Sequence, residues 1–147
     1  MLRLEAEEES ELPGLRVFGT ADAFHAARVS ADVLLSPIQD TRSTAAPPLV
    51  WLECLAMGIP ILTTEIPGTD EVVIDGKSGY TVRSPEAGRD RLQAMMVDRE
   101  VRRRLREGAR RVAVERYTVD RALNEYLNLW TTLANGSGVQ SGASGGP

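Results

Sequence analysis

Short apolar runs alternate with helical segments through the first half of the chain. The run ADVLLS at residues 31–36 is apolar enough for a strand buried on both faces, and IPILTT at 59–64 has the same character. Strands that alternate with helices at short spacing are typical of a parallel sheet with helices on both faces. We therefore expect an α/β, Rossmann-like fold whose parallel strands lie at 15–18, 31–36, 59–64 and 79–82.

Helix signals fill the intervals between these strands. Pro47 and Pro48 suit the first turn of a helix, because their missing N–H groups would have no intrahelical partner there. Gly58 suits the C-terminal cap of that helix. Thr69 or Asp70 could cap a short helix at 69–75, and Thr118 the last helix. The other expected helices are at 21–30, 86–97, 99–116 and 119–134, and residues 1–12 also have helical character.

The length of the chain fits one domain. A chain of 147 residues buries roughly two thirds of its unfolded surface in a single core. The segment NGSGVQSGASGGP at 135–147 is rich in Gly and Ser, a composition that does not order itself. We expect a domain over 1–134 and a flexible tail over 135–147.

Charge and cysteine content exclude several classes of function. The net charge is -4 and the isoelectric point about 5.1, so the chain has no overall field that would gather nucleic acid. The arginine-rich stretch at 99–111 is interpreted as a solvated helical face. Cys54 is the only cysteine, which excludes an intramolecular disulfide and a cysteine-built metal site. The acidic N-terminus and the lack of an apolar run of about 20 residues predict a cytoplasmic protein without a transmembrane segment.

Candidate binding residues follow two of the expected strands. In an open parallel sheet, ligands lie beyond the carboxyl ends of the strands, here after Ser36 and after Thr64. The N-terminus of the helix near residue 47 offers unpaired N–H groups and a partial positive charge, which suit a phosphate. The phosphate-binding candidates are the amides of Leu49 and Val50 and the hydroxyls of Ser43 and Thr44, and the second loop contains Pro67 and Gly68.

Glu53 is the one carboxylate within the apolar run at 49–56. An ionised carboxylate there needs a polar partner. Glu53 follows Leu49 by one helical turn, so a ribose with two vicinal hydroxyls is one candidate partner. The amides of a neighbouring loop are another, and the residues alone leave both open.

Other reactive residues lack the partners that catalysis requires. His25 has no serine, cysteine or second histidine to work with, so a surface or packing role is expected. Cys54 is expected to be a buried, inert thiol. Glu65, Asp70 and Glu71 flank the second loop, where Asp70 and Glu71 balance the helix dipole. No metal site is expected, and no catalytic residue can be assigned.

Several blocks of the chain resemble a known family. LECLAMGIPILTTEIPGTDEVVIDGKSGYTV at 52–82 is similar to the donor-binding half of the GT-B retaining glycosyltransferases, the glycosyl transferases group 1 type. LRVFG at 15–19, ADVLLSP at 31–37 and ERYTVDRALNEYLNLW at 115–130 match further blocks in the same order. The resemblance covers about residues 12–133. It implies transfer of a sugar from a nucleotide-diphosphate sugar to an acceptor, with Glu53 on the ribose, Leu49 on a donor phosphate, and no cofactor beyond that substrate.

The chain departs from the family pattern in one loop. The family places a first glutamate eight residues before the second, followed by Gly, an aromatic residue and Gly. Ala45, Ala46, Pro47 and Pro48 occupy these positions, so the first carboxylate is missing and two prolines donate no N–H bond. Asp40 would substitute only if the loop folds back.

The resemblance also implies that this chain is one part of an enzyme. It begins after the family's first C-terminal-domain strands and contains no acceptor domain, so we expect the isolated chain to be inactive and to need an N-terminal half from a longer chain or a partner. The alternative is a non-catalytic nucleotide-binding or protein-interaction module with the same fold. A nucleotide-sugar epimerase is a narrower option, for which no acid and base pair is identified.

The last helix has an apolar stripe, defined as Leu123, Tyr126, Leu127, Trp130 and Leu133. We expect this stripe to be mostly core. Without the missing half, part of it and the sheet edge beside Val17 would be exposed, which predicts self-association or poor solubility.

Overall fold

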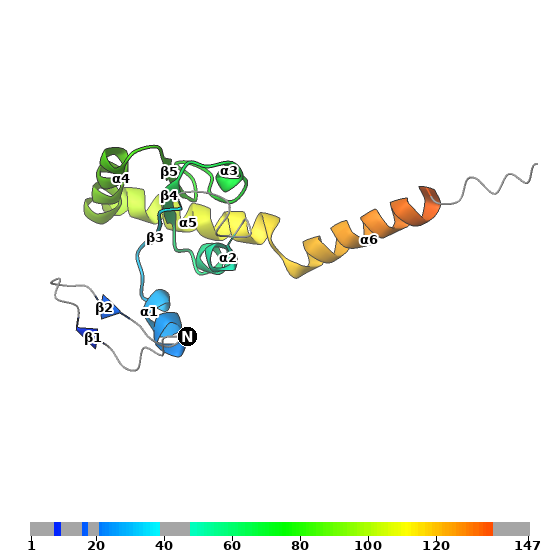
Figure 1. The fold of residues 1–147 in the computed structure, drawn as a ribbon, viewed down its shortest axis with the longest axis horizontal. Helices are drawn as coiled ribbons and strands as arrows, with labels where there is room; N and C mark the ends of the chain where they lie inside the picture. The colour runs from blue at the N-terminus through cyan, green and yellow to red at the C-terminus, as the bar shows by residue number, and fades with distance from the viewer. Residues whose placement is uncertain (1–7, 10–15, 18–20, 39–47, 137–147) are drawn as a thin grey trace, which may run out of the picture.

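The computed structural model describes residues 8–9, 16–17, 21–38 and 48–136 (Figure 1). Its centre is a parallel sheet of β3 (Leu34–Ser36), β4 (Ile61–Thr64) and β5 (Gly79–Val82), in the order β3-β4-β5. In the register of this sheet, Leu34 lies opposite Ile61, and Ile61 lies opposite Gly79. The expected α/β, Rossmann-like sheet is confirmed for these three strands.

Six helices are described, and most agree with the expected segments. Ser84 and Asp98 cap α4 and α5 by accepting hydrogen bonds from the first turns, and Thr118 accepts one from the amide of Arg121 at 3.3 Å. Gly58 ends the C-terminal cap of α2: it follows the C-cap residue Met57 and has φ of 72°, the left-handed backbone that glycine commonly supplies there. The helices are α1 (Ala21–Val29), α2 (Leu49–Ala56), α3 (Thr69–Val72), α4 (Pro85–Val97), α5 (Arg99–Arg116) and α6 (Val119–Gly136).

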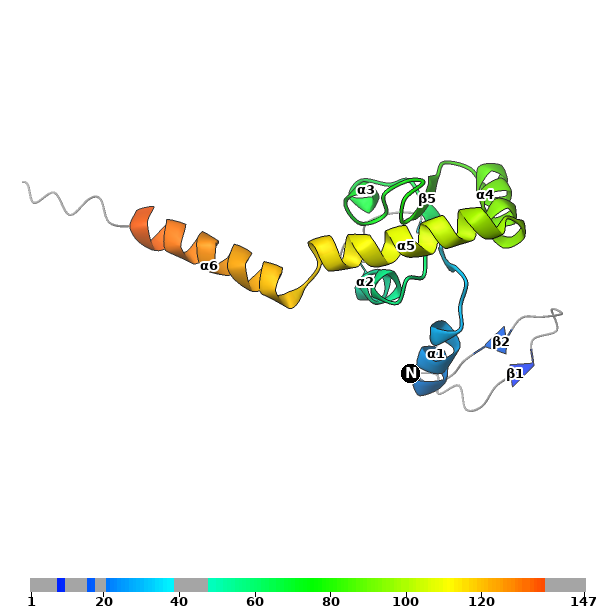
Figure 2. The same cartoon turned by 180° about the vertical axis from the view of Figure 1, so that it is seen from behind.

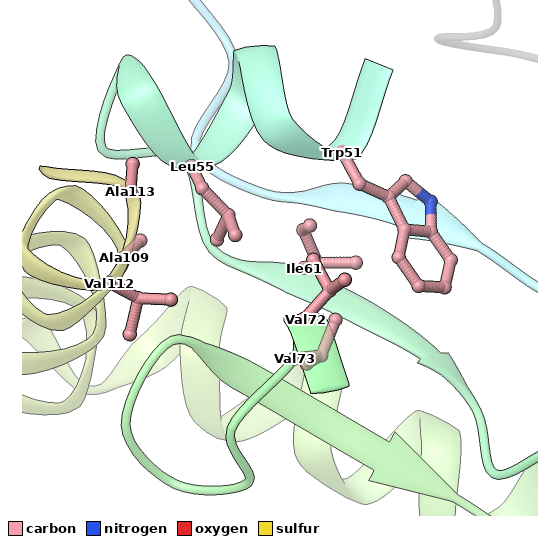
Figure 3. Close-up of a cluster of buried hydrophobic side chains, with 8 residues drawn as sticks. All are labelled: Trp51, Leu55, Ile61, Val72, Val73, Ala109, Val112 and Ala113. Carbon is pink, nitrogen blue, oxygen red and sulfur yellow. The ribbon is translucent and has the colours of Figure 1, made fainter. Parts of the chain in front are cut away.

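Helices cover both faces of the sheet because successive residues of β4 point to opposite sides. Ile61 lies in a cluster with residues of α2, α3 and α5, whereas Leu62 lies in a second cluster with α4 and α5. In Figure 3, Trp51 and Leu55 extend from α2 toward Ile61, and α5 closes the other side. The buried members of the first cluster are Trp51, Leu55, Ile61, Val72, Val73, Ala109, Val112 and Ala113.

Two glycines permit close approach of backbones around this core. A Cβ atom on Gly79 would lie 1.9 Å from the carbonyl oxygen of Ile61 on β4. A Cβ atom on Gly108 would lie 2.0 Å from the carbonyl oxygen of Lys77, in the turn before β5. The absence of a side chain at these two positions lets β5 lie close to β4 and α5 lie close to that turn.

The expected strand at 15–18 is wrong in its pairing. Arg16–Val17 forms β2, which pairs antiparallel with β1 (Glu8–Glu9) in a separate sheet, with Glu8 opposite Val17. Glu8 and Glu9 are therefore in a strand, not in a helix. The two segments are close in sequence, so bringing them together costs little chain entropy. The sheet edge beside Val17 consequently belongs to the antiparallel pair of β1 and β2 and not to the parallel sheet.

The cap expected for α3 is also wrong. Gly68, with φ of 89°, is the N-cap, and no side chain caps the helix. Left-handed backbone is accessible to glycine without strain, which explains its use here. The Thr69 hydroxyl instead donates to the carbonyl of Ile66 at 2.8 Å.

Helix α6 differs from the sequence expectation in both length and environment. It continues through Gly136, so Asn135 and Gly136 of the expected tail are helical; residues 137–147 lie outside the described part. The helix extends away from the sheet in both views (Figures 1 and 2). The apolar stripe is 48–67% exposed, so its assignment to the core is wrong. Within the described residues, no helix has the length and apolarity needed to cross a membrane.

Candidate functional site

At the carboxyl edge of the sheet, the loop that follows β3 is bonded to the end of β4. The Thr63 hydroxyl, on β4, donates to the carbonyl of Ser36 at 2.8 Å. The amide of Ile38 donates to Thr64 Oγ1 at 3.0 Å, and the Thr64 hydroxyl donates to the carbonyl of Ile38. These bonds join the start of the loop after β3 to the end of β4.

Helix α2 begins beside this edge. Pro48 is its N-cap residue, with extended backbone and no side-chain hydrogen bond that caps the first turn. Trp51 is 1% exposed and donates its indole N–H to Ser36 Oγ at 3.0 Å. The first turn of α2, with Leu49 70% exposed, is therefore held against the end of β3 with its outer side open to solvent.

Glu53 lies one turn further along α2, and its carboxylate is paired. Arg28 of α1 donates from Nη1 to Glu53 Oε2. The side chain of Glu53 is 45% exposed and that of Arg28 is 9% exposed. Arg28 Nη2 lies 2.8 Å from Nδ1 of His25, which is three residues earlier on α1. Glu53 thus has a partner that was absent from both sequence interpretations, a largely covered cation on the helix before β3.

This pair could not be predicted from the sequence, for a physical reason. Arg28 and Glu53 are separated by 25 positions, and no local periodicity connects them. Arg28 is the basic residue of the last turn of α1, where a cation is expected simply to balance the helix dipole. An arginine in an alanine-rich helix, followed by a lone carboxylate in an apolar helix, was the only signal available.

Part of the candidate site lies outside the described residues. This applies to the phosphate candidates Ser43 and Thr44, to Asp40, and to the loop positions Ala45 and Ala46. The structure therefore describes the helical half of the phosphate candidate, with Leu49 and Val50, and not the loop that precedes it.

The second loop lines a polar cavity of about 600 Å³. Two of its carboxylates form hydrogen bonds within the protein. Asp75 Oδ1 accepts one from the amide of Thr81 at 3.1 Å, and Glu65 accepts two from Arg83 at 2.6 and 2.8 Å. The hydrogen bonds from Arg83 lower the pKa of Glu65. An acidic lining repels phosphate, so this cavity is unsuited to a diphosphate. Its lining residues are Glu65, Ile66, Pro67, Thr69, Asp70, Asp75 and Thr81.

A second cavity, which the sequence did not indicate, lies between the sheet and α4. It has a volume of about 410 Å³ and a mostly apolar lining that includes Leu35, Leu62, Val82 and Leu92. Ser84 and Gly88 of the N-terminal turns of α4 border it as well. Leu35 is 55% exposed, so this face of β3 is only partly covered among the described residues.

The remaining chemically reactive residues take structural or surface positions. Cys54 is fully buried, and this burial raises the pKa of its thiol, which disfavours the thiolate form. The expectation of a buried thiol is confirmed. In the part of the chain that the structure describes, no three His, Cys, Asp or Glu side chains gather closely enough to hold a metal ion.

Comparison with known proteins places this architecture in a family. The family model for glycosyl transferases group 1 matches residues 2–112. The chain is 30% identical over 84 residues to spore coat protein SA of Bacillus subtilis (strain 168). It is 27% identical over 88 residues to alpha-D-kanosaminyltransferase of Streptomyces kanamyceticus. It is 29% identical over 84 residues to N-acetyl-alpha-D-glucosaminyl L-malate synthase of Bacillus anthracis. These matches cover 55, 58 and 56% of this chain but only 22% of each relative. Because the family match extends over more than half of the chain, and the parallel sheet agrees with it, the chain belongs to the glycosyl transferases group 1 family.

Proposed function

We propose that this chain supplies the donor-binding part of a glycosyltransferase, which transfers a sugar from a nucleotide-diphosphate sugar to an acceptor. The observation that carries the proposal is the position of α2. Its first turn lies at the carboxyl edge of the parallel sheet, held there by the bond from Trp51 to Ser36, and Glu53 follows one turn further on. Family membership supports the same assignment.

The two ends of this site suit the two polar parts of a nucleoside diphosphate. The N-terminal turn of α2 presents backbone N–H groups and the positive end of the helix dipole, which favour the diphosphate through Leu49 and Val50. A carboxylate accepts short, strong hydrogen bonds from hydroxyl groups, and a ribose offers two of them side by side. In this proposal the diphosphate lies at Leu49 and the ribose at Glu53.

The other parts of the reaction belong to regions outside the match. Each curated relative is covered over only 22% of its length, so acceptor binding and the reacting groups are assigned to the remaining part of such an enzyme. We therefore expect the isolated chain to bind a nucleotide but not to catalyse sugar transfer. The N-terminal half would come from a longer chain or a partner.

One observation favours a second candidate function. Ala45 and Ala46 stand where the family pattern has a glutamate and a glycine, and two prolines follow them. A chain that has lost this loop chemistry would be a nucleotide-binding or protein-interaction module of the same family. Nucleotide affinity alone is shared by a catalytic part and a nucleotide-binding module, whereas a pure interaction module has none.

The test is calorimetric titration of the chain with UDP, GDP and ADP. We expect one of them to bind, and Glu53→Gln to weaken that binding by about 1.5–3 kcal/mol, the contribution of hydrogen bonds to a charged group. The substitution keeps the size of the side chain and removes its charge. Glu107→Gln is the matched control, because Glu107 pairs with Arg103 on the exposed side of α5.

Two results would count against the donor site. If none of the three nucleotides binds, the interaction module replaces the proposal. If one binds with equal affinity to the wild type and to Glu53→Gln, a nucleotide site exists but the assignment of the ribose to Glu53 is wrong. The Glu107→Gln control should bind as the wild type does in either case.

A further inference from the structure

The ion pair of Arg28 and Glu53 joins α1 to α2 beside the proposed donor site. Arg28 is only 9% exposed, although it carries a permanent charge. A guanidinium removed from water is tolerated only with acceptors close to it, because its desolvation is otherwise costly. Its acceptors include groups on two different helices, Oε2 of Glu53 on α2 and Nδ1 of His25 on α1.

The geometry of the guanidinium restricts the carboxylate. Nη1 of Arg28 donates to Glu53, while Nη2 lies 2.8 Å from the ring nitrogen of His25. Since the guanidinium is planar and rigid, fixing one nitrogen through His25 fixes the direction of the other. Arg28 therefore holds the Glu53 side chain in one orientation. A free glutamate samples several rotamers, and restraining it before a ligand arrives reduces the entropy lost on binding.

The pair leaves room for a ligand on the same carboxylate. Arg28 contacts Oε2, and 45% of the Glu53 side chain remains exposed. An ionised carboxylate has about four acceptor positions on its two oxygens. Glu53 can therefore accept hydrogen bonds from ribose hydroxyls while Arg28 stays in place.

We propose that Arg28 is a positioning residue of the donor site, which orients the Glu53 carboxylate for the ribose hydroxyls. This inference rests on the proposed function, because it assigns a ribose to Glu53. It also makes α1 part of the site, although α1 precedes the parallel sheet in the chain. Arg28 acts through Glu53 and does not itself contact the nucleotide.

The test measures discrimination between a ribose and a sugar without its hydroxyls. The nucleoside diphosphate that binds the chain and its 2′,3′-dideoxy counterpart are titrated into the wild type, Arg28→Met and Arg28→Lys. We expect the wild type to prefer the ribonucleotide by about tenfold or more, the factor for losing a hydrogen bond to a charged group. In Arg28→Met, the ratio of the affinity for the ribonucleotide to that for the dideoxynucleotide should fall toward its value in Glu53→Gln. Arg28→Lys, which retains the charge without the planar fork, should recover part of it.

A matched control separates positioning from general stability. Arg103→Met removes an arginine that pairs with Glu100 and Glu107 on α5. This variant should keep the wild-type ratio. A purely structural role of Arg28 would weaken both nucleotides equally and leave the ratio unchanged. If Arg28→Met does not fold, as judged by circular dichroism, the ratio for Arg28→Lys decides.

The possible results separate the role of Arg28 from the proposed function of the donor site. If the wild type discriminates and the Arg28 variants discriminate equally well, the positioning role is wrong and the donor site stands. Tighter ribonucleotide binding by Arg28→Met would also overturn the inference, because Arg28 would then compete with the ribose. A wild type that shows no binding or no preference contradicts the proposed role of Glu53, and the role of Arg28 with it.

Discussion

Gly108 has no side chain at the point where α5 crosses the turn before β5. A Cβ atom there would lie 2.0 Å from the backbone oxygen of Lys77, whereas at Gly88 of α4 it would meet only Val82 Cγ2 at 3.6 Å. We expect Gly108→Ala to lower the free energy of unfolding by about 1–3 kcal/mol, as overpacking does. Gly88→Ala should raise it by about 0.5–1 kcal/mol through helix propensity. Urea denaturation of both variants measures the difference, and a Gly108→Ala variant as stable as the wild type would contradict the close approach.

The burial of the Cys54 thiol can be tested by its reactivity. Burial raises the pKa of this thiol in the folded chain. We expect a thiol reagent at pH 8 to react with the native chain far more slowly than with the chain in denaturant. Because the folded pKa exceeds the unfolded one, the stability linked to this group is present below the unfolded pKa and is lost as pH rises toward the folded value. Equal reaction rates in the two states would contradict the burial.

At the scale of the elements, the sequence predicted those that depend on local pattern. β4, β5 and the helices α4 and α5 lie within a few residues of their expected positions, because continuous apolar runs and cap residues mark them. β3 is shorter than expected, since only Leu34–Ser36 finds a partner on β4. Apart from the cap of α3 and the helix expected at Glu8 and Glu9, the failures concern partners: the pairing of Arg16 and Val17, and the surroundings of α6. Periodicity shows that a face is apolar, but it does not identify what covers that face.

The helices differ in how much their apolar residues stabilise the fold. Leu55 of α2 is fully buried in the main cluster, whereas Leu123 of α6 is 54% exposed. We expect Leu55→Ala to reduce the free energy of unfolding by about 2–5 kcal/mol. Leu123→Ala should change it by no more than about 0.5 kcal/mol, as for other exposed positions. The two variants are compared by urea denaturation at a dilute chain concentration, and equal losses would show that α6 packs on the domain.

At the scale of the whole molecule, α6 presents an apolar surface that the described residues do not cover. Its stripe is 48–67% exposed, and contiguous apolar surface of this kind favours association. We expect the chain to form oligomers whose mass rises with concentration in light scattering. Leu127→Lys should shift it toward the monomer, while Asn128→Lys, at a neighbouring polar position, should have a smaller effect. A chain that stays monomeric at every concentration would contradict this expectation.

The candidate site was only partly predictable from the sequence. The two loops and the first turn of α2 were expected because chain order and strand direction bring them to one edge, and the bonds of Ser36 and Thr64 join the first of these loops to the end of β4. The partner of Glu53 was not expected, since the contact joins α1 and α2 across 25 positions. Such a pair depends on how the helices pack, which no local pattern encodes. The role of Glu53 in binding stays a prediction.

The most direct measurement is a map of amide chemical shifts in the isotope-labelled chain during titration with the nucleoside diphosphate that binds. We expect the largest changes at Leu49 and Val50, beside the diphosphate, and at Glu53, beside the ribose. Changes concentrated instead at Ser84 and Gly88, around the apolar cavity next to α4, would place the nucleotide elsewhere and contradict the donor site.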